Sequence, residues 1–379
     1  MSQYVFYFYR QLLYQLFFYY FCKSKYNKTH MIRTLQSLRF FFIMLVVISH
    51  YIGKSFDFGG ECGVSFFFIL SGFVLSFAYS EKITMGTYST KSLVTKQLTK
   101  IYPLHLATFL FMYLLDLRIS HDYDISVIIP TILLLQSWFP ADRFYFVANG
   151  SSWFLCDMLF FYTIFALLNK YLLGNNKRTV CYAYVVALVV YICLIATLPD
   201  KLINPILYAN PLTRLLDFSF GILIFKFYQS EKGTIIRDTI KRQSAITISM
   251  TEAVIILSVV LIAILYPHCP QRIRTASLFW LVIPSFIFFF SISDNSRGAF
   301  SRFLHQKPIV WLGNLSFTIY LIHMPVFRVV NNISIILGIT PNSLTHFSIS
   351  VSLLIFFSYF IHIITQHCAL KIQKGFHLL

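Results

Sequence analysis

Long apolar runs alternate with short polar segments along almost the whole chain. A transmembrane helix needs about 20 mostly apolar residues to cross the hydrocarbon core of a bilayer. Ten runs meet this requirement, with some latitude for short spans: 35–52, 62–80, 101–117, 152–170, 179–198, 213–229, 244–266, 276–292, 309–327 and 346–366. The pattern therefore predicts an all-α, polytopic integral membrane protein with about ten transmembrane helices.

An eleventh apolar segment, ISVIIPTILLLQSWF at 125–139, is short and contains Pro130. If this segment does not cross the membrane, the loops on the N-terminal side hold most of the lysines and arginines. If it does cross, every later loop changes sides and the basic residues are divided almost equally. The positive-inside rule favours the first arrangement. We therefore predict ten spans, both termini in the cytoplasm, and 125–139 as a re-entrant or surface-lying segment.

Composition agrees with a multi-pass membrane protein, because the chain is 57% hydrophobic and only 12% charged, with 42 phenylalanines in 379 residues. The formal net charge of +17 could indicate a nucleic-acid partner. The basic residues lie in short gaps between apolar runs, however, so the positive-inside rule explains them and no nucleic-acid partner is expected. The seven cysteines form no CxxC pair and show no metal-ligand spacing, so no metal site is predicted.

The first thirty residues differ from the rest of the chain. Residues 1–22 are rich in Phe and Tyr but carry Arg10 in mid-run, and no small-residue cleavage site precedes the lysines. We predict an interfacial N-terminal extension over 1–30, or alternatively that Met31 is the true start. The membrane domain is predicted over 31–370, with a short cytoplasmic tail at 371–379.

The first apolar run carries two ionisable residues, Arg39 and His50, which are eleven residues apart. In a helix this spacing corresponds to roughly 16 Å along the axis and about three turns, so both side chains project from one face. An ionisable residue within a membrane span is a functional hypothesis by default. The alternative is that Arg39 is an inside anchor and His50 an interfacial cap.

Five further sequence blocks follow this pair in a fixed order. They are GECGVSFFFILSGFVLS (Gly60–Ser76), LTKIYPLHL (Leu98–Leu106), SSWFLCDMLFFY (Ser151–Tyr162), RLLDFSFGILI (Arg214–Ile224) and LGNLSFTIYLIHMPV (Leu312–Val326). Together with Arg39-x10-His50, they resemble the signature blocks of the membrane acyltransferase-3 family, the O-acyltransferases that modify cell-surface polysaccharides such as O-antigen or exopolysaccharide. Each block is a weak signal, but the ordered series over 35–326 is a strong one.

Two departures from the family pattern affect what the resemblance implies. The family often has R-x-x-R before the third helix, whereas this chain has Gln97 and Lys100, with Lys96 adjacent. Lysine keeps the charge but loses the bidentate fork of arginine. The tryptophan block often carries a glutamate five residues on, where this chain has Met158, with Asp157 one position earlier.

The resemblance and the chemistry of acyl transfer together suggest roles for particular residues. We expect His50 to act as the catalytic base, because imidazole titrates near pH ~6.5, and Glu61 to be its favoured carboxylate partner. Basic residues at the inner face are expected to bind a phosphate-rich donor: Arg39, Lys100 and Lys96. Possible accessory residues are Trp153, Asp157, Tyr320 and His323, for which a structural role is the alternative.

Other features of the apolar runs predict structural roles. Arg214 and Asp217 lie one helical turn apart, so they are expected to pair. Gly63, Ser71 and Gly72 are expected to allow close helix packing. Glu252 lies within a predicted span and has no partner that the sequence identifies.

The leading functional prediction is a membrane O-acetyltransferase in the cell inner (plasma) membrane. It would move an acyl group from cytoplasmic acyl-CoA, with acetyl-CoA as donor substrate and no bound cofactor, to a hydroxyl of a cell-surface polysaccharide or its lipid-linked precursor. One alternative is a transporter or flippase for a lipid-linked saccharide, but no clear internal repeat supports it. The other is an acyl relay that serves a separate transferase.

Overall fold

The computed structural model describes residues 31–52, 59–118, 123–174, 176–275, 277–294, 297–340 and 343–376. The prediction of an N-terminal extension over 1–30 falls outside this part of the chain. Ile32–Leu379 form one compact unit. The described residues are predominantly helical and contain no strand, which confirms the all-α prediction.

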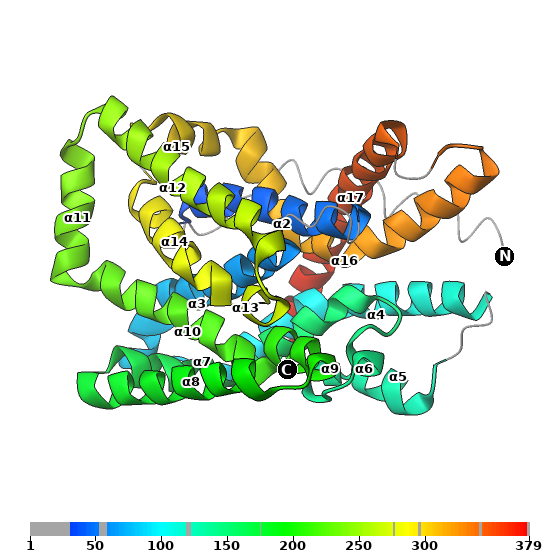
Figure 1. Cartoon of the computed structure of the whole chain (residues 1–379), viewed down its shortest axis with the longest axis horizontal. Helices are drawn as coiled ribbons and strands as arrows, with labels where there is room; N and C mark the ends of the chain where they lie inside the picture. The colour runs from blue at the N-terminus through cyan, green and yellow to red at the C-terminus, as the bar shows by residue number, and fades with distance from the viewer. Residues whose placement is uncertain are drawn as a thin grey trace. The chain divides into compact units, whose positions relative to one another are not determined.

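Ten helices of this unit correspond to the ten predicted spans (Figure 1). They are α2 (Arg33–Ile52), α3 (Gly60–Thr84), α4 (Thr90–Arg118), α7 (Trp153–Leu173), α8 (Lys177–Thr197), α10 (Pro211–Gln229), α12 (Ala245–Leu265), α14 (Ile283–Ile292), α16 (Lys307–Ile336) and α17 (Leu344–Phe376). Eight of them are long and apolar enough to cross a membrane. The other two are α10, which carries Arg214, Asp217 and Lys226, and α14, which has 10 residues.

Shorter elements connect these helices. The short α-helices are α5 (Ile125–Ile132), α6 (Asp142–Tyr145), α9 (Asp200–Leu202), α11 (Glu231–Arg242), α13 (Gln271–Arg274) and α15 (Ala299–Leu304). Single 3-10 turns lie at Gln136–Trp138, Gly150–Ser152, Tyr266–His268 and Ser277–Leu281, and a π-helical turn lies at Ile203–Tyr208. In Figure 1, α11 lies upright at the left edge and connects the end of α10 to the start of α12.

Contacts between the helices show that their directions alternate along the chain. Arg39 of α2 bonds Ser316 of α16, and Tyr51 packs on Phe327, so α2 and α16 run in the same direction. The helix α3 runs opposite to α2, because the ring of Phe42 stacks on that of Phe66 while Ser49 lies against the start of α3.

The same comparison gives the directions of α7 and α4. The helix α7 runs in the same direction as α3, since Phe68 packs on Phe161 and, further along both helices, Ser76 accepts a bond from Asn169. The helix α4 runs in the same direction as α16, because Lys100 lies over Phe317, and Asp116, further along α4, pairs with Arg328, further along α16. Thus α4 and α7 run in opposite directions although α5 lies between them.

The segment 125–139 therefore does not add a crossing. Its helix α5 has 8 residues, about 12 Å, and a turn follows it. Asp124 caps α5 by accepting a 2.7 Å bond from the backbone N–H of Ser126. This backbone hydrogen bond to the charged form lowers the pKa of the Asp124 carboxyl below its ordinary value.

The structure corrects one predicted span, 276–292. A continuous helix was expected, but the chain forms the 3-10 turn Ser277–Leu281, leaves helical geometry at Val282, and begins α14 at Ile283. Pro284 lies in the first turn of α14. Since proline has no N–H to donate and clashes with the preceding turn, it favours a helix start at this point rather than a helix interior.

Glycines bring the central helices close together. A Cβ on Gly72 would lie 2.0 Å from the carbonyl oxygen of Phe218, and one on Gly221 would lie 1.9 Å from that of Ile69. On the other side of α3, a Cβ on Gly63 would meet α2 at 2.6 Å. The predicted role of Gly63 and Gly72 in close packing is therefore confirmed, and α3 lies between α2 and α10.

Three charged residues in the bundle have structural partners. Arg214 and Asp217 form the predicted ion pair at 3.2 Å, with both side chains fully buried. Glu252 of α12 accepts bonds from the backbone N–H groups of Phe300 and Ser301, at 2.9 and 3.0 Å. Glu252 thus satisfies the first turn of α15, where backbone donors have no partner within the helix. This contact with a distant segment of the chain explains how Glu252 is accommodated within α12, although the sequence identifies no partner for it.

Candidate functional site

The site is built on the contact between α2 and α16. Along α16, Ser316, Tyr320, His323 and Phe327 are spaced by four, three and four residues, which places them on one face. This face meets α2 along the line from Arg39 to His50. The Nε of Arg39 donates to the hydroxyl of Ser316 at 3.1 Å, and the rings of His50 and His323 lie 5.0 Å apart.

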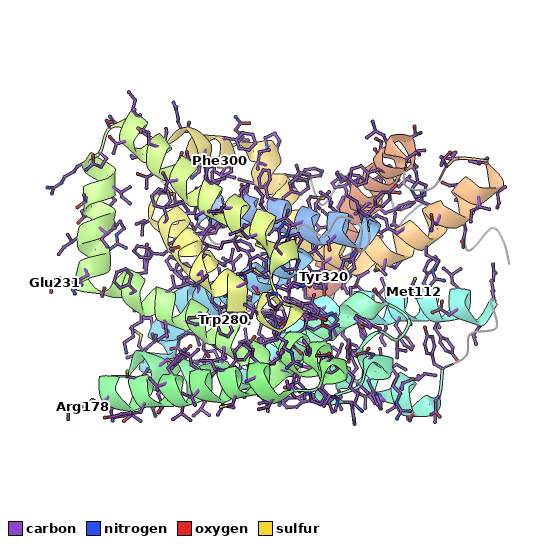
Figure 2. The ribbon with its side chains drawn as sticks, viewed as in Figure 1. Met112, Arg178, Glu231, Trp280, Phe300 and Tyr320 are labelled. Atoms are coloured by element: carbon purple, nitrogen blue, oxygen red, sulfur yellow. The ribbon has the colours of Figure 1, made fainter. Side chains whose placement is uncertain are left out.

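Cavity 1 lies at the Arg39 end of this contact and has a volume of about 100 Å³. Arg39 and Lys100 supply positive charge to its wall, and Tyr162 and Tyr320 supply aromatic surface. Figure 2 shows Tyr320 among the side chains that fill the space between the helices. The remaining lining residues are Val46, Val64, Phe67, Ser71, Gln97, Ile101, Phe154, Leu155, Met158, Ser316 and Phe317. Cavity 1 is therefore a mainly apolar pocket with a cationic side.

Cavity 2 lies at the His50 end and has a volume of about 400 Å³. It is lined by residues from four helices, the segment before α5 and the loop before α7: His50, Tyr51, Met112, Tyr123, Phe146, Ala148, Gly150, Met324, Phe327, Arg328, Asn331 and His346. Met112, labelled in Figure 2, marks the part of α4 that reaches this cavity. The two cavities thus lie along one helix face, with His50 and His323 at the level between Tyr320 and Phe327.

Backbone carbonyls fix the orientation of both histidine rings. The Nδ1 of His50 lies 2.8 Å from the carbonyl oxygen of Val46, and that of His323 lies 2.6 Å from the carbonyl oxygen of Tyr320. Because a carbonyl oxygen can only accept, each Nδ1 carries the proton and each Nε2 keeps its lone pair. In this tautomer the neutral rings present Nε2 as the basic nitrogen.

His323 is fully buried, and its Nε2 has no hydrogen-bond partner among the described residues. Tyr320 contacts His323 through its backbone carbonyl group. The Tyr320 hydroxyl instead donates a 2.6 Å bond to the carbonyl oxygen of Ser151. Asn149 adds a bond to the carbonyl oxygen of Leu321, so the loop before α7 is fastened to this face of α16.

The other predicted site residues occupy different positions. Glu61 lies half-buried in the first turn of α3 and is not among the described residues lining either cavity. The Val46 carbonyl accepts the Nδ1 proton of His50, and the pairing of His50 with Glu61 stays a prediction. Lys96 is exposed one turn before Lys100 and is likewise absent from the lining residues.

Trp153 and Asp157 are buried between α7 and the elements packed against it. The Trp153 ring packs against Tyr208 at 4.8 Å. Asp157 is fully buried and interacts electrostatically with Arg214 and Asp217. The structure therefore groups Asp157 with the buried ion pair, and neither residue lines the two cavities as described.

Sequence reasoning missed several residues of this region. Ser316 and Tyr162 lie within the quoted blocks, and the four-residue spacing from Ser316 to Tyr320 was a usable signal. Tyr51 and His346 gave no such signal, because they are 295 positions apart and meet only in the folded chain. No group of three potential metal ligands is found in the part of the chain that the structure describes.

Comparisons with known proteins identify the family of the chain. Residues 32–363 match the family model described as an acyltransferase domain. The chain is 26% identical over 289 residues to the acyltransferase MdmB of Streptomyces mycarofaciens, covering 71% of this chain and 68% of that protein. No solved structure is significantly similar to the chain. Because the family model spans most of its length, the chain belongs to this acyltransferase family and is a membrane acyltransferase.

Proposed function

We propose that this acyltransferase moves an acetyl group from cytoplasmic acetyl-CoA to a hydroxyl of a cell-surface polysaccharide or of its lipid-linked precursor, and that it works in the inner (plasma) membrane. One observation carries the proposal. Arg39 and His50 lie on one face of α2, roughly 16 Å apart, and each lines its own cavity. This separation is comparable with the length of an extended pantetheine arm.

The donor site is assigned to the Arg39 end. The terminal guanidinium nitrogens of Arg39 make no hydrogen bond to a described residue, while its Nε is held by Ser316. A guanidinium fixed in this way can bind a phosphate through two parallel bonds, and Lys100 adds a second positive charge to the same cavity. Lys96, exposed one turn away, would contact the donor only at the mouth.

The chemical step is assigned to the His50 end. With Nδ1 protonated and bonded to Val46, the lone pair of His50 lies on Nε2, which would take the proton of the acceptor hydroxyl. The hydroxyl oxygen attacks the thioester carbonyl, the C–S bond breaks, and the imidazolium returns its proton to the departing CoA thiolate. We favour this direct transfer over an acyl-histidine intermediate, because a hydroxyl beside a base needs none. Glu61 would favour the imidazolium form through its negative charge.

The orientation follows from the positive-inside rule, which assigns the Arg39 end to the cytoplasm. Reporter tags test it. A tag after Lys232, in the connection between α10 and α12, should report cytoplasm, and one after Asp200, between α8 and α10, should report the outside. The opposite result would put the proposed donor site on the wrong side of the membrane for cytoplasmic acyl-CoA.

The function itself is tested by comparing surface polysaccharide from cells with and without the gene, using mass spectrometry and NMR. The expected result is one acetyl group per repeat that is lost with the gene and restored by the native chain, but not by His50→Ala. A polysaccharide that is unchanged in acylation but no longer reaches the surface would contradict the proposal and favour a transporter.

A further inference from the structure

The short helix α11 lies at the end of the bundle where α2 begins. The helix α10, which leads into α11, runs in the same direction as α3. Near the start of both helices the Arg214 side chain bonds Ser65, and further along both the ring of Tyr228 lies 6.0 Å from that of Phe77. Since α3 runs opposite to α2, α10 ends where α2 starts, at the end that the positive-inside rule assigns to the cytoplasm.

The helix α11 is fastened to this end of the bundle and lies crosswise to the spanning helices α2 and α8 (Figure 1). Ser230 alone separates it from α10, and Gln243 and Ser244 separate it from α12. A Cβ on Gly233 would lie 2.1 Å from the carbonyl oxygen of Phe227, so α11 packs directly on the last turn of α10. These short links keep α11 at the level where the spanning helices end.

One face of α11 is packed, and the surface next to it is apolar but exposed. Gly233 is buried, and Ile240 packs against the hydrophobic core. Ile236 lies one turn before Ile240 and borders the packed face, yet it is 38% exposed. Ile235 beside it is 58% exposed. Two adjoining isoleucines are therefore uncovered on a helix that has already packed its inner face.

The helices on either side of α11 expose apolar side chains up to the same level. Phe227, in the last turn of α10, and Ile246, in the first turn of α12, are both exposed. Exposed apolar side chains of membrane-spanning helices face the acyl chains of the lipids. Hydrocarbon therefore reaches both ends of α11, and its two exposed isoleucines lie at the boundary between acyl chains and headgroups.

Exposed cations flank the two isoleucines along α11. Lys232 lies one turn before them, and Arg242 lies two turns after the first of them. The helix has four basic and two acidic residues, and one of the acidic residues, Asp238, pairs with Lys241 elsewhere on its surface. A helix with exposed apolar side chains between lysine and arginine is typical of the membrane interface. The partner that fits is negatively charged and adjoins hydrocarbon, as the headgroup of an anionic phospholipid does.

We propose that α11 is an interfacial helix that binds anionic phospholipid of the cytoplasmic leaflet. Ile235 and Ile236 insert between the lipids, while Lys232 and Arg242 contact their phosphate groups. Anionic lipids give the surface of this leaflet its negative potential, so the partner is present there. The inference goes beyond the proposed acyl transfer and takes from it only the side of the membrane, since neither cation is among the described residues lining the two cavities.

Local hydrogen exchange tests the contact with headgroups. The purified full chain is placed in nanodiscs of phosphatidylcholine alone, or of equal parts of phosphatidylcholine and phosphatidylglycerol, and exchange is followed by mass spectrometry. The amide hydrogens of α11 should exchange roughly two- to tenfold more slowly with the anionic lipid, because a bound lipid stabilises the helix against local opening. The double variant Lys232→Gln with Arg242→Gln should lose this difference.

A second double variant is the matched control. Arg302→Gln with Lys307→Gln also removes two exposed cations at the end of the bundle where α2 begins, but from α15 and α16. Exchange in α11 should respond to phosphatidylglycerol in this control as it does in the native chain.

Fluorescence tests whether the isoleucines enter the bilayer. Ile235→Trp and Lys241→Trp each add one indole to the four tryptophans of the chain, on different sides of α11. The nanodiscs contain lipids with bromine on their acyl chains, which quenches an indole only on contact. The fluorescence added by Ile235→Trp should be strongly quenched, and that added by Lys241→Trp much less.

Each result decides the inference. Equal exchange of α11 in the two lipid mixtures, or a difference that survives Lys232→Gln with Arg242→Gln, overturns headgroup binding. Equal quenching of the two added indoles overturns insertion and favours an acidic protein as the partner of α11. Acetyl transfer should stay native in Lys232→Gln with Arg242→Gln, so failure of the inference leaves the proposed function standing. A native chain that transfers no acetyl group would in turn leave the lipid contact standing.

Discussion

Two polar sites within the helix bundle handle positive charge in opposite ways. Arg214 is fully buried and is paired with Asp217 on its own helix, and Asp217 also accepts a bond from the indole N–H of Trp280. The Arg214 guanidinium further lies 5.1 Å from the centre of the Phe68 ring. Arg39 is half-buried, its Nε donates to the neutral hydroxyl of Ser316, and a second cation, Lys100, lines the same cavity.

The difference separates a structural arginine from one available to a ligand. A buried charge with its counter-ion in the same helix is balanced before any substrate arrives. Two cations facing one cavity without a carboxylate among its described lining residues repel each other, and an anion relieves that repulsion. Variants of the Arg214–Asp217 site should therefore change stability, whereas variants along the line from Arg39 to His50 should change activity.

The largest effect is expected at His50. Replacing it with alanine removes the proposed base, so acetyl transfer should fall by roughly 10²–10⁴-fold. Thermal unfolding of the purified chain should be almost unchanged, because the His50 side chain is exposed at the end of α2. His268→Ala is the control, as another exposed histidine. A His50→Ala enzyme with native activity would remove the proposed chemical step.

The next largest effect is expected at Asp217, and on stability. Asp217→Ala leaves Arg214 buried without its counter-ion, which typically costs about 3–5 kcal/mol. The measurements are yield after membrane extraction and the midpoint of thermal unfolding. The double variant Arg214→Met with Asp217→Leu removes both charges and should recover much of the loss. If Asp217→Ala were fully stable but inactive, this pair would belong to the functional site, and the comparison would fail.

Arg39 should show the reverse behaviour. Arg39→Ala should weaken acetyl-CoA binding about 10- to 100-fold, the value of charge-assisted bonds to phosphate, with little change in unfolding. Arg39→Lys should recover little if two parallel bonds matter, and Lys100→Ala should have a smaller effect. Binding is measured on the purified chain, with Arg33→Ala as control, because Arg33 is exposed at the start of the same helix. Native affinity in Arg39→Ala would refute the donor site.

The fold was predictable from the sequence where one physical rule dominates. Length and hydropathy located the helices, and the positive-inside rule decided correctly that 125–139 adds no crossing. Hydropathy gave the wrong helix at 276–292, because it does not register the helix break before Pro284. Glu252 shows a second limit, since the backbone N–H groups that it binds belong to residues 48 and 49 positions away.

The candidate site was predictable only in part, for a similar reason. Arg39 and His50 share one helix, so their spacing alone places them on one face. The Arg214–Asp217 pair was accessible for the same reason. The partner of Arg39 lies 277 positions along the chain, and that of Tyr51 lies 295 positions along it. Such contacts depend on how α16 and α17 pack against α2, which periodicity within one helix does not specify.

The smallest effect is expected at Ser316, and it bears most directly on what distinguishes Arg39 from Arg214. Ser316→Ala removes the 3.1 Å bond that holds the Arg39 Nε, while leaving both cations in cavity 1. The net value of one such bond predicts a roughly two- to tenfold weaker affinity for acetyl-CoA. Thr318→Val is the matched control, because it removes a buried hydroxyl from α16 without touching Arg39. In the Arg39→Ala background, Ser316→Ala should add nothing, since the two changes remove the same interaction. An additive loss would mean that Ser316 contacts the donor itself and that Arg39 does not depend on it for orientation.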